Sequence, residues 1–469
     1  MQLEERSYPH YNMAFLWRVC LVAAMGGLLF GYDWVVIGGA KPFYEPFFGI
    51  SAKPYWQGFA MSSALFGCIL GAMVSGVTSD RFGRKRLLIL SGFLFTWSAV
   101  WTAMAGDFTS FNIARIIGGV GIGLASNLSP MYIAEISPAE MRGRFVSINQ
   151  LTIVIGILAA QVVNFLIAQP VADSATPELI RETWNGVYGW RWMFGAETVP
   201  AAMFFLLMFF MPESPRWLVK KGRYEEAGRI LALVGGPRYA EYEVADIRQT
   251  IAGEAASQAP LDELIRPGML PILALGVFLA VFQQWCGINV IFNYAQEVFE
   301  AAGYEVGELM LSIVITGIVN LVFTFVAIFT VDRLGRRPLM LIGAASLAAI
   351  YAILGTGYYL EAKGLLMLVL VVAAIACYAM SLAPITWVVI SELFPNRIRG
   401  AAMSIAVVSL WLACAALTFT FPLLKDALGA YGAFWLYGAI CVVGYLVIYV
   451  RLPETKGKSL EEIERELVD

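Results

Sequence analysis

The sequence predicts an all-α membrane protein in which twelve transmembrane helices form two six-helix halves. The first observation behind this prediction is the composition: of 469 residues, 59% are hydrophobic, only 14% are charged, and the mean hydropathy is +0.70. Soluble domains carry about 25% charged residues, and no soluble fold of this length could bury so much apolar surface. The other two observations are a series of long apolar runs and an internal repeat.

Each of the apolar runs is long enough to cross a bilayer as a helix, for which about 20 residues are needed. The runs are continuously apolar, whereas the strands of a membrane barrel alternate apolar and polar residues. The first run is too long for a cleavable signal peptide, and no small-residue cleavage site ends it. The twelve predicted spans are approximately 13–38, 55–78, 86–105, 108–134, 144–168, 190–211, 268–298, 308–331, 338–360, 364–391, 400–424 and 429–451.

The connections between the spans differ in their content of Lys and Arg. If both termini lie on the same side of the membrane, that side carries 25 basic residues and the opposite loops carry 6. Basic residues concentrate on the cytoplasmic side of membrane proteins. We therefore expect both termini in the cytoplasm, and a multi-pass protein of the plasma membrane, such as a bacterial inner membrane.

Three motifs of the first half recur in the second, after the corresponding second, fourth and sixth spans. This order indicates a parallel six-plus-six duplication about an axis along the membrane normal. The pairs are DRFGRK (80–85) with DRLGRR (332–337), EISPAEMRGR (135–144) with ELFPNRIRG (392–400), and PESPR (212–216) with PETKG (453–457).

The repeat and the polar segments predict four parts of the chain. Residues 1–212 form an N-terminal six-helix bundle, and residues 268–452 form a C-terminal one. Segment 213–267 has the pattern of short amphipathic helices and is expected as a cytoplasmic helical linker. The tail 453–469, which contains SLEEIEREL, is expected as a short cytoplasmic helix.

Several function classes are disfavoured by the residues that are scarce. The net charge is −3 without a basic tract, which argues against nucleic acid as a partner. The sequence has one histidine, His10, which argues against a His-ligated metal site and against His-based catalysis. The glycines of GGVGIG (118–123) follow no strand, so they indicate close helix packing rather than a dinucleotide loop. Six cysteines, expected as buried small hydrophobes, are scattered singly: Cys20, Cys68, Cys286, Cys377, Cys414 and Cys441.

Eight motifs in register, over essentially the whole chain, resemble the sugar porter family of the major facilitator superfamily. The resemblance implies a secondary transporter that imports a monosaccharide, most simply D-xylose or D-glucose, by proton symport through alternating access. It implies a monomer in the lipid bilayer, with no cofactor, no metal and no catalytic residue. The motifs are GLLFGYD (27–33), DRFGRK, the run 118–143, PESPRW (212–217), QQWCGIN (283–289), DRLGRRP (332–338), ELFPNRIRG and PETKGKS (453–459).

Three ionisable residues lie deep within predicted spans of the N-terminal half: Asp33, Arg115 and Glu197. Such groups are costly in a membrane unless they face the protein interior and find a partner. A carboxylate beside a guanidinium favours the charged form, whereas a desolvated carboxylate alone favours the protonated form. Asp33 could therefore bind a proton when it is released from Arg115, with Glu197 as a second proton site or partner. A permanent structural ion pair remains the alternative.

Uncharged polar side chains within the spans match the chemistry of a sugar. Each side-chain amide donates and accepts hydrogen bonds, as a hydroxyl does, and an indole offers a flat face to the sugar ring. Gly287 is expected to loosen the helix that carries three of these amides. Buried amides can also simply bridge helices, which is the competing interpretation. By resemblance, the sugar site comprises Gln150, Gln283, Gln284, Asn289 and Asn320, with Phe30 and Trp387 against the ring.

The duplicated polar motifs predict a gate at the cytoplasmic ends of the helices, in which salt bridges join the two bundles when the inward path is shut. Exposed pairs contribute about 0–1 kcal/mol each, so only a network could bias the states. A solvated, positively charged loop would explain the basic residues but not the acids at matching offsets. The expected members are Asp80, Arg84, Glu135, Arg142, Glu213, Arg333, Arg336, Glu392, Arg399 and Glu454.

Three positions depart from the family pattern: Asn293 replaces a tyrosine, and Leu410 and Cys414 replace amides. These changes affect the preferred sugar more than the sugar class. A facilitative uniporter, in which Asp33 is only structural, remains open. A sugar receptor and an intramembrane enzyme are less favoured: a short segment follows the last span, and no nucleophile–base pair or metal cluster lies within the spans.

Overall fold

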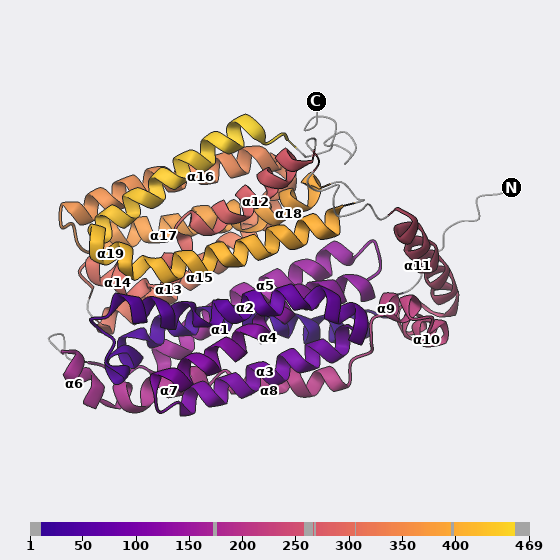
Figure 1. The fold of residues 1–469 in the computed structure, drawn as a ribbon, viewed down its shortest axis with the longest axis horizontal. Helices are drawn as coiled ribbons and strands as arrows, with labels where there is room; N and C mark the ends of the chain where they lie inside the picture. Colours follow the sequence, from indigo (N-terminus) through magenta and orange to yellow (C-terminus); the bar gives the residue numbers. More distant parts are fainter. Residues whose placement is uncertain are drawn as a thin grey trace.

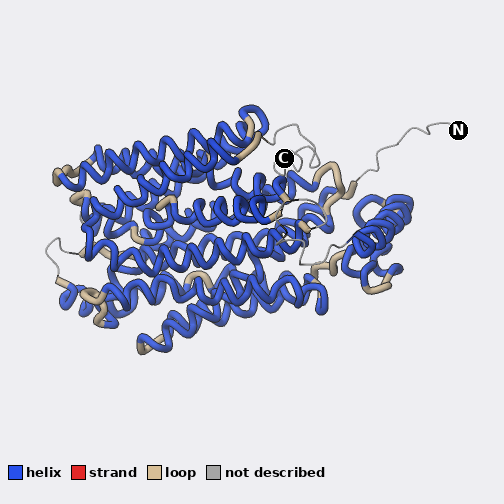
Figure 2. Tube along the Cα trace, turned by 45° about the horizontal axis from the view of Figure 1, so that its top comes forward, coloured by secondary structure: helices blue, strands red, loops and turns tan. Residues whose placement is uncertain are grey.

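The computed structural model consists of long helices that run along a common direction in two layers, and Figure 2 shows no strand in the part of the chain that is described. In Figure 1 the N-terminal helices form the lower layer and the C-terminal helices the upper one. The structure describes residues 11–171, 176–257, 266, 269–304, 306–394 and 398–454.

The N-terminal half contains six membrane-length helices, the last of which is assembled from three consecutive pieces. A short helix, α6 (Pro177–Glu182), precedes this sixth span. The spans are α1 (Met13–Phe48), α2 (Pro54–Phe82), α3 (Arg84–Met104), α4 (Phe108–Ile136), α5 (Arg142–Ile167), and η1 (Asn185–Gly189) with α7 (Trp190–Gly195) and α8 (Thr198–Phe209).

The C-terminal half supplies the remaining six spans among the described residues. Its last two spans form one continuous element, α19, whose backbone is non-helical at Gly429 (φ 70°), so that a turn separates two segments of membrane length. The elements are α12 (Leu270–Trp285), α13 (Ile288–Asn293), α14 (Ala295–Ala301), α15 (Val306–Leu334), α16 (Arg336–Tyr359), α17 (Leu365–Met380), α18 (Leu382–Leu393) and α19 (Arg399–Arg451).

The contacts between the halves follow the duplication. Across the seam, α2 packs against α19 and α5 packs against α15, while α1 contacts α13 and α14. The second and eighth spans, and the fifth and eleventh, are repeat equivalents. The first two contacts are therefore the same contact made twice, as a parallel repeat requires.

The linker helices gather at one end of the bundle, which we call the linker end; the opposite end, where α6 lies, is the α6 end (Figure 1). The start of α1 is attached there, because the Asn12 amide donates to the Val234 carbonyl at 2.8 Å. Residues 258–265, 267–268 and 455–469, which hold parts of the expected linker and tail helices, lie outside the described residues. The linker helices are α9 (Pro215–Lys220), α10 (Tyr224–Gly235) and α11 (Pro237–Ser257).

The glycine-rich run of α4 packs directly on α2. A Cβ atom on Gly119 would lie 1.9 Å from the Ala64 carbonyl oxygen, and one on Gly67 would lie 2.0 Å from the Ile116 carbonyl oxygen. Such close approach of two backbones is possible only without side chains. The interpretation of these glycines as a packing surface is confirmed.

The first span is longer than predicted. Helix α1 continues ten residues past position 38, through Pro42 and Pro46, and ends at Phe48; Gly49, with a positive φ of 65°, caps it. The apolar run ends near Gly38, and the later polar residues indicated a loop. In the structure, Lys41 and Glu45 lie inside the helix and are buried, with consequences for the α6 end of the seam.

Candidate substrate-binding site

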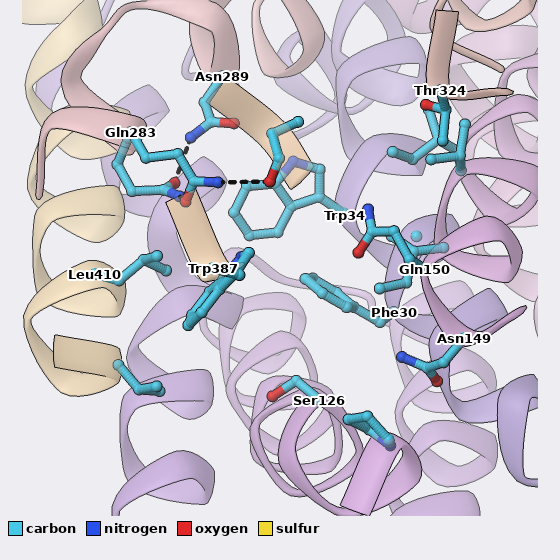
Figure 3. Close-up of a pocket in the computed structure, with 18 of the residues that line it drawn as sticks. Phe30, Trp34, Ser126, Asn149, Gln150, Gln283, Asn289, Thr324, Trp387 and Leu410 are labelled. Carbon is cyan, nitrogen blue, oxygen red and sulfur yellow. Dashed lines mark hydrogen bonds between the residues drawn. The ribbon is translucent and has the colours of Figure 1, made fainter. Parts of the chain in front are cut away.

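A central cavity of about 570 Å³ lies between the two halves and is lined by α1, α4 and α5 on one side and by α12, α13, α15, α17, α18 and α19 on the other. All seven residues expected from the sequence to contact a sugar line this cavity, several of which Figure 3 shows around one space. Those seven are Phe30, Gln150, Gln283, Gln284, Asn289, Asn320 and Trp387.

A chain of amides is built around the break in the seventh span. Helix α12 ends at Trp285, Gly287 has a φ of 87°, and α13 begins at the next residue, so the backbone turns beside the cavity. Asn289 Nδ2 donates to Gln284 Oε1 at 2.5 Å, and Gln284 Nε2 donates to Gln283 Oε1 at 3.3 Å. Gln283 Nε2 in turn donates to the Ala383 carbonyl at 3.1 Å (Figure 3). The mutual bonds hold the three amides in fixed positions.

The amides from the other helices are less constrained. The side chains of Gln150 and Asn320 make no hydrogen bond to another residue in the described part of the chain, although both line the cavity. Each can therefore present a donor and an acceptor to a bound molecule. The cavity combines pre-positioned amides from the C-terminal half with an unconstrained one from each half.

Aromatic rings form the wall of the cavity on the α1 side. The Trp34 ring centroid lies 5.8 Å from that of Phe30 and 6.0 Å from that of Trp411, and all three rings line the cavity. Trp34 and Trp411 were not predicted as site residues. The spacing of four residues between Phe30 and Trp34 was the available signal, because it places both rings on one face of a helix.

The two family departures in α19 lie in this region. Leu410 lines the cavity with an apolar side chain, and Cys414 Sγ is 3.7 Å from Asn289 Nδ2. A thiol is a weak hydrogen-bond acceptor. The α19 wall at these two positions therefore offers less polar contact than the amides that the resemblance would place there.

The cavity extends further toward the linker end than toward the α6 end. It reaches Val146 and Met403, each five positions into a helix that begins at the linker end, and Pro130, six residues before α4 ends there. On α1 the lining stops at Trp34, fourteen residues before the helix ends near α6. The central cavity is therefore approached from the linker end.

The charged residues expected deep in the N-terminal half divide into a pair and a single acid. Arg115 donates from Nη1 to Asp33 Oδ1 and from Nη2 to the Asp33 carbonyl at 3.3 Å, and both side chains are almost fully buried. Glu197 is buried within electrostatic range of both, and its Oε1 has no hydrogen-bond partner among the described residues. The structure thus pairs Asp33 with Arg115.

A second buried charge cluster, missed in the sequence, closes the α6 end of the seam. Lys41 of α1 forms ion pairs with Glu45 on the same helix, at 3.0 Å, and with Glu297 on α14 of the other half. Each of the three side chains is less than a tenth exposed. The Gln161 amide also donates to Thr316 across the seam, at 3.3 Å. We call Lys41, Glu45 and Glu297 the seam triad.

The seam triad borders a polar vestibule of about 920 Å³ at the α6 end, which Glu300 and Lys425 also line. Burial raises the pKa of Glu300 above its ordinary value. Because the triad joins α1 to α14, separation of the two halves at this end requires its ion pairs to break.

The duplicated motifs form matching contacts at the linker end. In the N-terminal half, Arg84 Nη2 lies 2.9 Å from Glu135 Oε1, and Glu213 accepts from the Arg84 and Lys85 amides at 3.0 and 3.1 Å. A Cβ atom on Gly83, which has a φ of 92°, would lie 2.3 Å from the Glu213 carboxylate. Only glycine fits this turn.

The C-terminal half repeats the arrangement. Arg336 Nη2 lies 3.3 Å from Glu392 Oε1, and Glu454 accepts from the Arg336 and Arg337 amides at 3.0 and 3.1 Å. Gly335 (φ 89°) is the equivalent of Gly83, and its Cβ would lie 2.8 Å from Glu454. The same turn and carboxylate therefore recur in both halves.

These contacts join helix ends within each half. Asp80 pairs with Arg84 at 3.3 Å and with Lys220 at 2.8 Å, and Arg142 donates from Nε to the Ala134 carbonyl at 3.0 Å, again within one half. The side chains of Arg333 and Arg399 lie outside the described residues. The bridges between the halves that we expect when the linker end is shut stay a prediction.

We expect Glu135→Ala to destabilise the protein much more than Lys220→Ala. Glu135 and Arg84 are 9% and 8% exposed, whereas Lys220 and its partner Asp80 are about half exposed. Loss of one partner from a buried pair costs about 3–5 kcal/mol, and loss of an exposed pair costs about 0–1 kcal/mol. Thermal unfolding in detergent measures the difference, and equal shifts in Tm for the two variants would contradict it.

Comparisons of the chain with known proteins agree with this architecture. The chain matches the family model described as "Sugar (and other) transporter" over residues 19–467. It is 40% identical to the D-xylose-proton symporter of Escherichia coli and 38% identical to the arabinose-proton symporter of Bacillus subtilis, in each case over 97% of this chain and 96% of the other. The inward open conformation of the xylose transporter XylE from E. coli aligns with a TM-score of 0.82 and 38% identity, over 96% of this chain and 99% of that one.

The family model covers nearly the whole chain, and the similarity extends over nearly the full length of the relatives. The twelve spans, the parallel repeat and the cavity at the seam are features of the same fold. The chain is a multi-pass membrane transporter and not an enzyme, and it belongs to the sugar porter family of the major facilitator superfamily.

Proposed function

We propose that the protein imports a monosaccharide, D-xylose or D-glucose, together with one proton, by alternating access at the central cavity. The observation that carries the proposal is the convergence of seven amide and aromatic side chains from both halves on one cavity, with the Asp33–Arg115 pair close behind its wall. Sugar transport is what the family does. The proposed sugar and the proposed coupling to protons rest on this site and on the relatives, which are described as proton symporters of D-xylose and arabinose.

The site offers the two kinds of contact that a sugar needs. The amides of Gln283, Gln284 and Asn289 can replace water around the hydroxyl groups, and the rings of Phe30 and Trp387 can pack on the apolar face. A buried site that hydrogen-bonds a hydroxyl rejects molecules that lack it, because its own polar groups would be left unpaired. The position of each amide then determines which sugar epimers fit.

The linker end is proposed to face the cytoplasm, because the basic loops lie there and such loops stay inside. In this orientation the structure is an inward-facing state: the cavity extends to the linker end, and the seam triad closes the outer side. Rocking of the two halves would close the cavity at the linker end and open the seam at the α6 end. The outer side then opens as Lys41 parts from Glu297, and the duplicated motifs meet across the inner side.

Proton coupling is proposed to act through Asp33. Protonation of this carboxylate removes its charge and weakens its attraction to Arg115, so the ion pair can separate, and loss of the proton restores the pair. A membrane potential of 100 mV contributes about 2.3 kcal/mol per charge, so one proton could support roughly fiftyfold accumulation of a neutral sugar.

The test uses the purified protein in proteoliposomes. Addition of D-xylose or D-glucose outside is expected to alkalinise an unbuffered external medium, and counterflow with a panel of pentoses and hexoses identifies the sugar. Sugar entry without a change in pH would leave a facilitative uniporter, and no counterflow with any sugar would contradict the proposal.

Gln283→Ala is expected to raise the half-saturating sugar concentration about tenfold or more, because it removes a positioned hydrogen-bonding group and unlinks Gln284. Lys220→Ala, far from the cavity, serves as the control and should leave this concentration unchanged. A Gln283→Ala variant that counterflows with normal affinity would exclude this amide from the sugar site.

A further inference from the structure

A third and much smaller cavity, of about 10 Å³, lies against the Asp33–Arg115 pair. Asp33, Trp34 and Arg115 line it from the N-terminal half, and Asn293 lines it from the C-terminal half. We call it the Asp33 chamber. Trp34 also lines the central cavity, and no other residue of the chamber does. The indole is thus the wall between the two spaces.

Three of the residues that line the Asp33 chamber carry polar atoms without partners. Asp33 Oδ2, Arg115 Nε and Asn293 Oδ1 are all buried and have no hydrogen-bond partner within the described residues. A buried water needs about 10–15 Å³ and two to four polar partners. The chamber lies at the lower limit of this volume, and its lining residues supply three unpaired polar atoms for a single water molecule. The remaining lining is apolar, from side chains such as Ile37 and Met61.

The indole of Trp34 is supported on its cavity side by two other rings. Phe30 meets it edge to face at an interplanar angle of 87°, and Trp411 of the other half meets it at 61°. The side chain cannot swing into the central cavity without displacing these rings. A small residue at this position would join the Asp33 chamber to the central cavity, which extends to the linker end.

We propose that Trp34 is a positioning residue that separates the sugar from the proton site, and that the Asp33 chamber holds one water molecule bridging Asp33 Oδ2 and Asn293. The proposal rests on the proton symport proposed above. Asn293 is uncharged and can donate to this water through Nδ2 or accept from it through Oδ1. Because Asn293 and Asp33 belong to different halves, rocking of the halves changes the distance between them and with it the size of the chamber.

The separation explains how coupling can be tight. With the indole in place, a proton reaches Asp33 through the chamber at the seam, and neither the sugar nor the water of the central cavity contacts the carboxylate. Without the indole, water from the linker end would reach Asp33 directly. A proton could then leave to that side without any sugar moving, and each sugar would be accompanied on average by less than one proton.

The experiment compares Trp34→Ala, Trp34→Phe and Trp387→Ala with the wild type in proteoliposomes, and measures protons per sugar, counterflow and sugar-independent proton leak. Trp34→Ala is expected to lower the proton-to-sugar ratio at least twofold and to raise the leak. Trp34 also lines the central cavity, so counterflow in this variant reports any change in sugar affinity, and the ratio is taken per sugar moved. Trp34→Phe should keep most of the coupling. Trp387→Ala enlarges the central cavity but not the chamber, so it should weaken sugar affinity at an unchanged ratio.

An unchanged ratio in Trp34→Ala, or an equal loss in Trp387→Ala, would overturn this inference while leaving proton symport intact. A wild type that moves sugar without protons would instead overturn the proposed symport, and this inference with it. If Trp34→Ala is not recovered from membranes, Asn293→Leu probes the same chamber. It is expected to slow proton-driven accumulation severalfold at unchanged counterflow, and an unchanged accumulation rate would count against the chamber.

Discussion

Asp33→Asn is expected to abolish accumulation of sugar against a gradient while counterflow continues. Asparagine has nearly the shape of aspartate and can still accept from Arg115, so the fold is retained, but it cannot bind and release a proton. Accumulation should fall from roughly fiftyfold at 100 mV to none. The measurement is uptake of labelled sugar into energised vesicles, compared with counterflow in the same preparation.

Glu197→Gln is the matched control, because it makes the same chemical change at the other buried acid of this half. If Glu197 is only a second partner in the cluster, its variant should still accumulate sugar. Accumulation that survives in Asp33→Asn would make the Asp33–Arg115 contact a structural ion pair. If Glu197→Gln alone were to lose accumulation, the proton site would move to Glu197.

Lys41→Met is expected to shift the protein toward a state that is open at the α6 end. Lys41 is the cation between Glu45 and Glu297, and its loss leaves two buried carboxylates that repel across the seam. Removal of one partner from a buried ion pair costs about 3–5 kcal/mol. Because the seam triad is formed in the closed arrangement, this cost falls on that arrangement, and opening relieves it.

The readout is a cysteine at Thr316, which is 2% exposed and contacts Gln161 across the seam. A membrane-impermeant maleimide added outside should label Thr316→Cys at least tenfold faster in the Lys41→Met background. Lys425→Met is the control, because Lys425 lines the same vestibule but is not part of the seam triad. Labelling that is unchanged by Lys41→Met, or equally raised by Lys425→Met, would show that the triad does not hold this end closed.

Much of the architecture followed from the sequence because the lipid bilayer makes local composition decisive. A helix that crosses the membrane must be apolar over about 20 residues, whatever its neighbours are. The parallel repeat was visible in the motifs of both halves, and the structure matches it down to Gly83 and Gly335 with their carboxylate partners. The predicted end of α1 was wrong because a helix can continue past its apolar run when its polar residues find partners in the protein.

The candidate site could be predicted in part. Amides in an apolar span are costly without a partner, so those near Gly287 pointed to an interior cavity, and the structure brings them together with Gln150 and Asn320. Trp34 was overlooked, since a tryptophan in a membrane helix is unremarkable until its neighbours are known. Lys41 and Glu297 are 256 positions apart, and nothing local pairs them.

The number of spans, their repeat and the kind of chemistry in the interior can be predicted from the residues alone, because these depend on each segment's own exchange with lipid and water. Which side chains share a space follows from the packing of the helices: the indole between two cavities, the lysine between two carboxylates, and the described motif pairs, each formed within one half. Those arrangements depend on how helices rotate and cross when they pack, and packing is a property of pairs of segments rather than of any one of them.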